Sequence, residues 1–117
     1  IDRNNILDIY GFTEQLGTVY VSRGISGCRA SSYSEVLVRD TDTFELVEDG
    51  KEGFLQFLSI LPLSYPGFSI LNDDLGRITN RGETELGHSI LEFEVLSRLE
   101  KAESRGCGDT LPPDYYL

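Results

Sequence analysis

Residues 89–96 alternate between apolar and polar side chains, and this pattern limits what the chain can fold into more than any other. The apolar residues at the centre of the stretch share one face of an extended chain: Leu91, Phe93 and Val95. Glu92 and Glu94 lie on the opposite face. A period of two residues is that of a half-buried β-strand and differs from the period of a helix. We therefore expect a strand here, the clearest one in the sequence.

The rest of the chain favours short strands joined by turns. The residues at 18–21 are β-branched or aromatic, which is typical of a strand. Asp49-Gly50 is typical of a hairpin turn, because both residues take left-handed backbone conformations readily. Residues 23–34 predict a loop, and only residues 99–104 predict a helix, which would be short. The expected strands, apart from 89–96, are 6–10, 16–22, 36–38, 44–47 and 54–61.

Together these elements predict a mainly β fold with minor helix (α+β). We expect a small distorted β-barrel or packed antiparallel sheets. The length of 117 residues suits one small domain with a single modest core. Six Tyr and six Phe, within a hydrophobic fraction of 39%, favour a folded domain over a disordered chain.

An acidic pair follows the apolar residues of the stretch 66–78. Phe68, Ile70 and Leu71 predict a buried strand. Asp73, Asp74 and Gly76 are expected to end that strand in a turn, because Gly allows a positive φ and Asp hydrogen-bonds its own backbone. Two adjacent carboxylates could also accept hydrogen bonds from sugar hydroxyls or hold a cation. On these residues alone, an ordinary polar turn remains the alternative.

A second segment, Tyr10-Gly11-Phe12-Thr13-Glu14, offers groups suited to a nucleotide. The aromatic residues provide a face on which a base can stack, and the Gly lets the backbone approach a phosphate. Thr13 supplies a hydroxyl donor. Glu14 supplies a carboxylate, which suits Mg²⁺ because this hard cation prefers oxygen ligands.

Charge and composition exclude several other classes of function. The formal net charge of −10 would be repelled by a nucleic-acid duplex and by anionic membrane surfaces. No apolar run approaches the ~20 residues of a membrane span, and the N-terminus shows no secretion signal. Two cysteines, Cys28 and Cys107, are too few for a disulfide scaffold. We therefore expect a cytoplasmic protein with free thiols, in which the lone His88 is a solvated loop residue.

The two motifs, in their order and spacing, resemble the adenylate-forming enzymes, the superfamily of acyl-CoA synthetases and luciferase-like ligases. Residues 10–14 are similar to the Tyr-Gly-x-Thr-Glu segment of that superfamily. Residues 72–76 are similar to its Thr-Gly-Asp-Leu-Gly segment, with Asn and Asp in place of the Thr and the first Gly. Ser97-Arg98 stands where the superfamily has Gly-Arg at a hinge. The resemblance implies that Arg98 helps to position the nucleotide and takes part in catalysis.

The resemblance also implies that the other motif residues bind ATP and Mg²⁺. Tyr10 would stack on adenine, and Gly11 would line the nucleotide site. Asp74 would bind both ribose hydroxyls. Thr13 would contact the α-phosphate and contribute to catalysis, and Glu14 would hold Mg²⁺.

A narrower resemblance covers residues 52–67 together with 73–76, which are similar to the acyl-protein synthetases of bacterial luminescence fatty-acid reductase systems. Residues 98–109 resemble the end of that family, where a large mobile C-terminal domain is absent and a Cys takes the acyl group. The resemblance implies that ATP activates a fatty acid, or another carboxylic acid, to an acyl-adenylate. The acyl group would then pass to the protein's own Cys107 as a thioester. The nearby Arg105 is compatible with this role, because cationic charge lowers a thiol pKa.

In this interpretation the whole chain, 1–117, is the C-terminal and last subdomain of the nucleotide-binding body of a larger adenylating enzyme. It would comprise a strand and nucleotide loop at 1–16, a β subdomain at 17–96 and a hinge-like tail with the Cys at 97–117. The phosphate loop and the acyl pocket are expected upstream, so the chain alone is expected to form no acyl-adenylate.

Two other functions remain open from the sequence. One is an acyl-CoA ligase similar to phenylacetate-CoA ligases, and the other is a non-catalytic β-rich binding module. An acyl reductase is an expected protein partner. The apolar run 6–10 predicts a buried strand that normally pairs inside a sheet, and its free edge predicts a homodimer or a strand swap.

Overall fold

The computed structural model describes residues 2, 5–23 and 27–98. Within these residues seven antiparallel strands form one sheet in the order β1-β2-β3-β7-β6-β5-β4, and there is no α-helix. The mainly β fold class is confirmed. The strands are β1 Leu7–Tyr10, β2 Tyr20–Arg23, β3 Cys28–Arg29, β4 Ser34–Arg39, β5 Gly53–Ser59, β6 Ser69–Glu83 and β7 Ser89–Arg98. A search of the same residues for a helix long and apolar enough to cross a membrane finds none.

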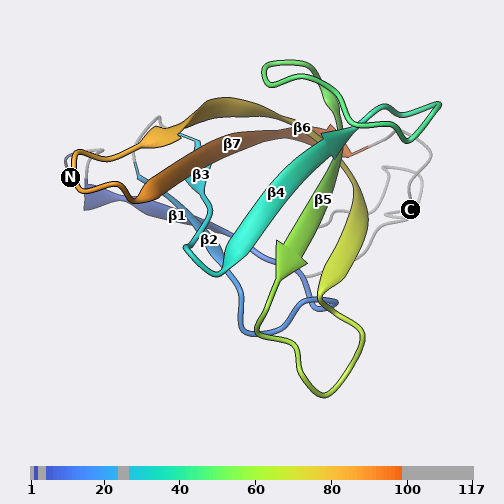
Figure 1. Ribbon diagram of the computed structural model, residues 1–117, viewed down its shortest axis with the longest axis horizontal. Coiled ribbons are helices and arrows are strands. Elements are labelled where there is room, and N and C mark those ends of the chain that lie inside the picture. The colour runs from blue at the N-terminus through green and yellow to red at the C-terminus, as the bar shows by residue number, and fades with distance from the viewer. Residues whose placement is uncertain (1, 3–4, 24–26, 99–117) are drawn as a thin grey trace, which may run out of the picture.

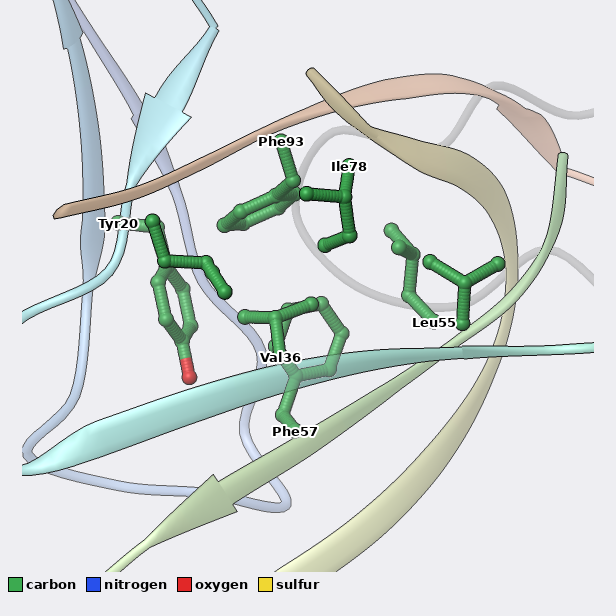
Figure 2. Close-up of a cluster of buried hydrophobic side chains, with 8 residues drawn as sticks. Tyr20, Val36, Leu55, Phe57, Ile78 and Phe93 are labelled. Atoms are coloured by element: carbon green, nitrogen blue, oxygen red, sulfur yellow. The ribbon is translucent and has the colours of Figure 1, made fainter. Parts of the chain in front are cut away.

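The sheet is strongly curled, so that its β1–β2 end faces β5 (Figure 1). The ring centroid of Phe57 on β5 lies 5.1 Å from that of Tyr20 on β2 and 5.6 Å from that of Tyr10 on β1. Figure 2 shows how side chains from five strands converge inside this curl. The buried core consists of Tyr20, Val36, Val38, Leu55, Phe57, Ile78, Leu91 and Phe93. One curled sheet therefore encloses the core in the manner of a small distorted barrel.

The strand predicted from the alternating pattern at 89–96 is confirmed as β7. Its inner face carries Leu91 and Phe93, which are 8% and 0% exposed. On its outer face Glu92 forms an ion pair with Arg29 at 3.1 Å. Because β7 lies between β3 and β6, it is a central strand of the sheet.

Most of the other expected strands form, although with different lengths. The strands expected at 36–38 and 54–61 are β4 and β5, and Gly50 between them has the predicted positive φ, of 91°. The strand expected at 16–22 begins only at Tyr20. The one expected at 44–47 is reduced to an isolated bridge between Arg39 and Leu46. The helix predicted at 99–104 lies outside the described residues.

Two expectations about the N-terminal third are wrong. The segment 23–34 is not entirely a loop, because β3 lies within it and bridges β2 to β7. β1 forms where expected, but it is an edge strand whose apolar side chains are not buried: Leu7 and Ile9 are 54% and 62% exposed. Among the described residues β1 has a neighbouring strand on one side only, so its other edge pairs with no strand there. Self-association through this edge stays a prediction.

The turn expected at the acidic pair is not formed. β6 continues through Asp73 and Asp74 for 15 residues in all. Phe68 and Leu71, which were expected to be buried, are 62% and 45% exposed. The strand therefore carries the acidic pair inside the sheet instead of ending there.

A β-bulge explains how β6 accommodates the acidic pair without breaking. Phe54 of β5 pairs with Leu75 and Gln56 pairs with Leu71, so an advance of two residues along β5 spans four along β6. Bulges bend a strand and redirect its side chains. Asp74, in the bulge, is only 8% exposed.

Gly76 allows β6 to approach β7 closely beside this bulge. A Cβ at this position would lie 2.4 Å from the carbonyl oxygen of Glu94 and 2.8 Å from a methyl carbon of Leu55. The clash involves backbone, which cannot move as a flexible side chain does. This close approach explains why position 76 is a Gly, which was expected to form part of a turn.

We expect Gly76→Ala to lower the free energy of unfolding by about 1–3 kcal/mol, the usual cost of overpacking a tight site. Gly82→Ala on the same strand is the matched control, because nothing lies within 4 Å of a Cβ there. This control should change the free energy of unfolding by no more than about 0.5 kcal/mol. Urea denaturation of the two variants measures the difference, and equal effects would contradict the close approach of β6 and β7.

Candidate nucleotide site

The two sequence motifs meet in the folded chain. The Tyr10 hydroxyl at the end of β1 donates a hydrogen bond of 2.5 Å to Oδ2 of Asp74 in the β6 bulge, across 64 residues of sequence. The Asn72 side-chain amide donates to the same hydroxyl oxygen at 3.0 Å. The curl of the sheet and the bulge together therefore bring the end of β1 against the acidic segment.

The Tyr10 ring is also part of the aromatic core. Its centroid lies 5.6–6.4 Å from those of four other rings, which are Phe12, Tyr20, Phe57 and Phe93. Tyr10 is half-buried as a result. The ring thus supports the loop that follows β1, and stacking on adenine stays a prediction.

A pocket of about 270 Å³ lies beside this contact. Its lining combines carboxylate, amide and aliphatic groups: Glu14, Ile70, Leu71, Asn72 and Asp73. The sequence analysis predicted that Glu14 and the acidic pair belong to one site, and the structure does bring them together. However, it is Asp73 that lines the pocket, whereas Asp74 accepts a hydrogen bond from Tyr10. A ribose that bound Asp74 would share this carboxylate with the Tyr10 hydroxyl.

The pocket has an acidic lining, which bears on how it could hold a nucleotide. The described part of its lining contains no Lys or Arg, and the described residues contain no group of three metal ligands. Mg²⁺ is usually held by one or two carboxylates together with water and substrate phosphates. Glu14 and Asp73 fit that arrangement, since they offer oxygen ligands and leave other positions to a phosphate. Thr13 donates a hydrogen bond of 3.3 Å to Glu14 and is exposed next to it.

Two further predicted residues lie at the edge of this region. Gly11 directly precedes the loop and is exposed. Arg98 pairs in register with Asp74, so the end of β7 reaches the same end of the sheet as the acidic pair. The roles of both residues in binding or catalysis stay predictions.

Sequence reasoning missed Gln15, which fixes the loop between β1 and β2. The side chain is 1% exposed, and its amide donates to the carbonyl oxygens of Phe57 at 3.3 Å and Gly67 at 3.0 Å. Its own carbonyl accepts a hydrogen bond of 3.2 Å from the Tyr20 hydroxyl. A polar Gln in a polar segment carries no sequence signal of burial, so only the fold could reveal it.

Cys28 and His88 lie among the described residues, whereas the third residue of the cysteine and histidine predictions does not. Cys107 lies outside the described residues. Cys28 is half-buried, and burial, followed by the nearby Asp8 carboxylate, raises the pKa of its thiol. A raised pKa disfavours the reactive thiolate. His88 is exposed in the turn between β6 and β7, where its backbone N–H donates to the Thr84 hydroxyl at 3.1 Å.

Comparison with known proteins adds one finding to this geometry. A protein-family model described as "Acyl-protein synthetase, LuxE" matches residues 1–115. No curated protein and no solved structure matches the chain. The matched region includes both motifs and the strands that bring them together.

Proposed function

Since the chain belongs to the LuxE family of acyl-protein synthetases, we propose that it takes part in the ATP-dependent activation of a fatty acid. In the first step a carboxylate oxygen of the acid attacks the α-phosphorus of ATP, and pyrophosphate leaves with the electrons of the broken P–O bond. In the second step the Cys107 thiolate attacks the acyl carbonyl carbon, and AMP leaves. The product is a thioester on the protein.

The contact between Tyr10 and Asp74 carries this proposal. It joins two segments that the resemblance assigns to one nucleotide site, although they are 64 residues apart in sequence. Asp74 is only 8% exposed, so it is not part of a solvated turn. The neighbouring pocket supplies the oxygen ligands that an ATP-bound cation requires.

In this proposal Glu14 and Asp73 hold Mg²⁺, Thr13 contacts the α-phosphate, and Asp74 and Tyr10 bind the nucleoside. Bound Mg²⁺ would stabilise the negative charge that develops around the α-phosphorus. Thr13 would donate a hydrogen bond to the same region, which favours the transition state because the donor is already oriented. Arg98, at the end of β7, would add a positive charge at that side of the acidic pocket.

The activity is tested with the complete reading frame that encodes this chain, given ATP, Mg²⁺ and a long-chain fatty acid. We expect acid-dependent exchange of labelled pyrophosphate into ATP, which reports the first step alone. Acyl label on the protein, released by neutral hydroxylamine, reports the thioester. Exchange without protein labelling, with the acyl group appearing only on added coenzyme A, would show the protein to be an acyl-CoA ligase instead.

The acidic pair provides a prediction about ATP affinity. Asp74→Ala removes a carboxylate that would accept charge-assisted hydrogen bonds worth about 1.5–3 kcal/mol. ATP affinity is therefore expected to fall about tenfold or more, and Asp73→Ala should reduce it less. Isothermal titration with a non-hydrolysable ATP analogue measures both.

Tyr10→Phe is the control for a structural role of Asp74, because it removes the hydrogen bond from the Tyr10 hydroxyl and keeps the carboxylate. We expect Tyr10→Phe to weaken ATP binding less than Asp74→Ala. Equal losses for Asp73→Ala and Asp74→Ala would show that the ribose role was assigned to the wrong residue of the pair.

A further inference from the structure

Gln15 directly follows Glu14, and its side chain joins three separate parts of the fold. Its side-chain N–H groups donate to the carbonyl oxygens of Phe57 in β5 and Gly67 in the β5–β6 connection. Its side-chain oxygen accepts from the Tyr20 hydroxyl in β2. Gln suits this position because its amide offers two donors and an acceptor at one site. No buried side-chain polar atom among the described residues is left without a partner, so the arrangement is fully satisfied.

Two neighbouring contacts press the same loop against the β5–β6 connection. The backbone N–H of Leu16 donates to the Tyr65 hydroxyl at 2.6 Å. A Cβ at Gly67 would lie 3.0 Å from the carbonyl oxygen of Glu14, so the two backbones are nearly in contact. Glu14 itself is exposed and lines the pocket.

We propose that Gln15 is the positioning residue of the site: it holds the backbone of Glu14 against β5 and the β5–β6 connection, and so fixes Glu14 at the pocket that Asp73 also lines. This inference rests on the proposed function, in which Glu14 and Asp73 share Mg²⁺. A carboxylate on a loop contributes fully to cation binding only if its backbone is already fixed, because otherwise binding must order the loop. Residues that orient a metal ligand typically change metal affinity 10- to 100-fold when they are replaced.

The test replaces Gln15 with Met, which keeps the length of the side chain and removes all three hydrogen bonds. At saturating ATP and fatty acid, the Mg²⁺ concentration for half-maximal pyrophosphate exchange should rise about 10- to 100-fold. A residue with only a structural role would lower the fraction of active protein, which reduces the maximal rate and leaves the half-maximal Mg²⁺ concentration unchanged. A shift in that concentration therefore separates positioning from stability.

Tyr65→Phe is the milder second variant, in case Gln15→Met fails to fold. It removes only the hydroxyl that accepts from the Leu16 N–H. This hydrogen bond is exposed, so the protein should fold normally. We expect the same shift in Mg²⁺ dependence with a smaller size. Unchanged Mg²⁺ dependence in a folded Tyr65→Phe or Gln15→Met variant would overturn the proposal.

Thr18→Val is the matched control within the same loop. The Thr18 hydroxyl is buried and hydrogen-bonds the Ser59 hydroxyl at 2.9 Å at the end of β5, whereas the Gln15 amide bonds the carbonyl oxygens of Phe57 and Gly67. We expect a comparable loss of thermal stability with no shift in Mg²⁺ dependence. An equal Mg²⁺ shift in Thr18→Val would show that general loosening of the loop explains the effect.

Hydrogen–deuterium exchange provides a readout that does not depend on activity. Backbone amides of residues 11–16 should exchange faster in Gln15→Met than in the wild type, with those of β6 and β7 unchanged. Unaltered exchange at residues 11–16 would overturn the anchoring role whatever the activity. Faster exchange in a protein whose wild type catalyses no pyrophosphate exchange would instead overturn the proposed function, and with it the assignment of Mg²⁺ to this loop.

Discussion

Replacing Cys107 with serine is expected to abolish stable acyl labelling of the protein while acid-dependent pyrophosphate exchange continues. The first step does not involve the thiol, so its rate should be largely unchanged. The second step needs a nucleophile that is partly ionised near neutral pH, which a thiol provides and an unassisted hydroxyl does not. Gel-resolved labelling with a radioactive fatty acid, before and after neutral hydroxylamine, measures the loss.

Cys28→Ser is the matched control for Cys107→Ser. Burial raises the pKa of the Cys28 thiol and so disfavours its thiolate. Both labelling and pyrophosphate exchange should therefore be unchanged in this variant. Normal labelling of Cys107→Ser, or loss of labelling in Cys28→Ser, would contradict the assignment of the acyl carrier.

Replacing Phe57 with alanine is expected to have the largest effect on stability. The side chain is fully buried, and its ring centroid lies 4.9 Å from that of Phe12 and 5.1 Å from that of Tyr20. Truncation of a buried Phe costs about 3–5 kcal/mol, because it removes apolar contacts and leaves a cavity. This loss is a large fraction of the total stability of a small domain, about 5–15 kcal/mol, so Phe57→Ala should lower the midpoint of thermal unfolding by more than about 10 °C.

Phe68→Ala is the control for Phe57→Ala, because its side chain is 62% exposed. The free energy of unfolding should change by no more than about 0.5 kcal/mol. Thermal unfolding followed by circular dichroism compares the two variants. Similar midpoints for Phe57→Ala and the wild type would show that the curled core of Figure 2 is wrong.

Local pattern was sufficient to predict β7, and also the positions of β4 and β5. The alternation around Phe93 depends only on which face of an extended chain is buried, so it can be read without knowing the neighbouring strands. The turn at Asp49-Gly50 was also predicted, because the preference of these residues for a turn is local. Gly50 has the expected positive φ.

The acidic segment could not be predicted in the same way. Turn chemistry at Asp73, Asp74 and Gly76 favoured a break, but the fold keeps β6 continuous and absorbs extra residues in a bulge. The deciding interactions come from distant residues: Tyr10 bonds Asp74, and the Glu94 carbonyl excludes a side chain at position 76. Local propensity carries no information about such contacts.

The residues of the candidate site also divide into those that a local motif identifies and those that only the fold reveals. Resemblance identified Glu14 and Asp74 from short motifs. In the structure Glu14 lines the pocket together with Asp73, and Asp74 bonds Tyr10. Gln15 belongs to no motif, and its burial depends on three partners that lie 5, 42 and 52 residues away. Positioning residues of this kind become visible only when the fold is known.

The sheet order also has a consequence for the order of folding. Strands β4 to β7 follow one another as neighbours, so they can form early from local hairpins. β3, in contrast, pairs with the distant β7, through Cys28 with Phe93 and Arg29 with Glu92. Closing a loop of that length costs more chain entropy than closing a hairpin, so late docking of β1–β3 is expected. Tyr10 and Glu14 arrive with this late segment, while Asp73 and Asp74 stand on the early one. A partly folded chain would therefore possess most of its sheet but only one half of its candidate site, and slow docking would delay completion of the site behind the gain of β-structure.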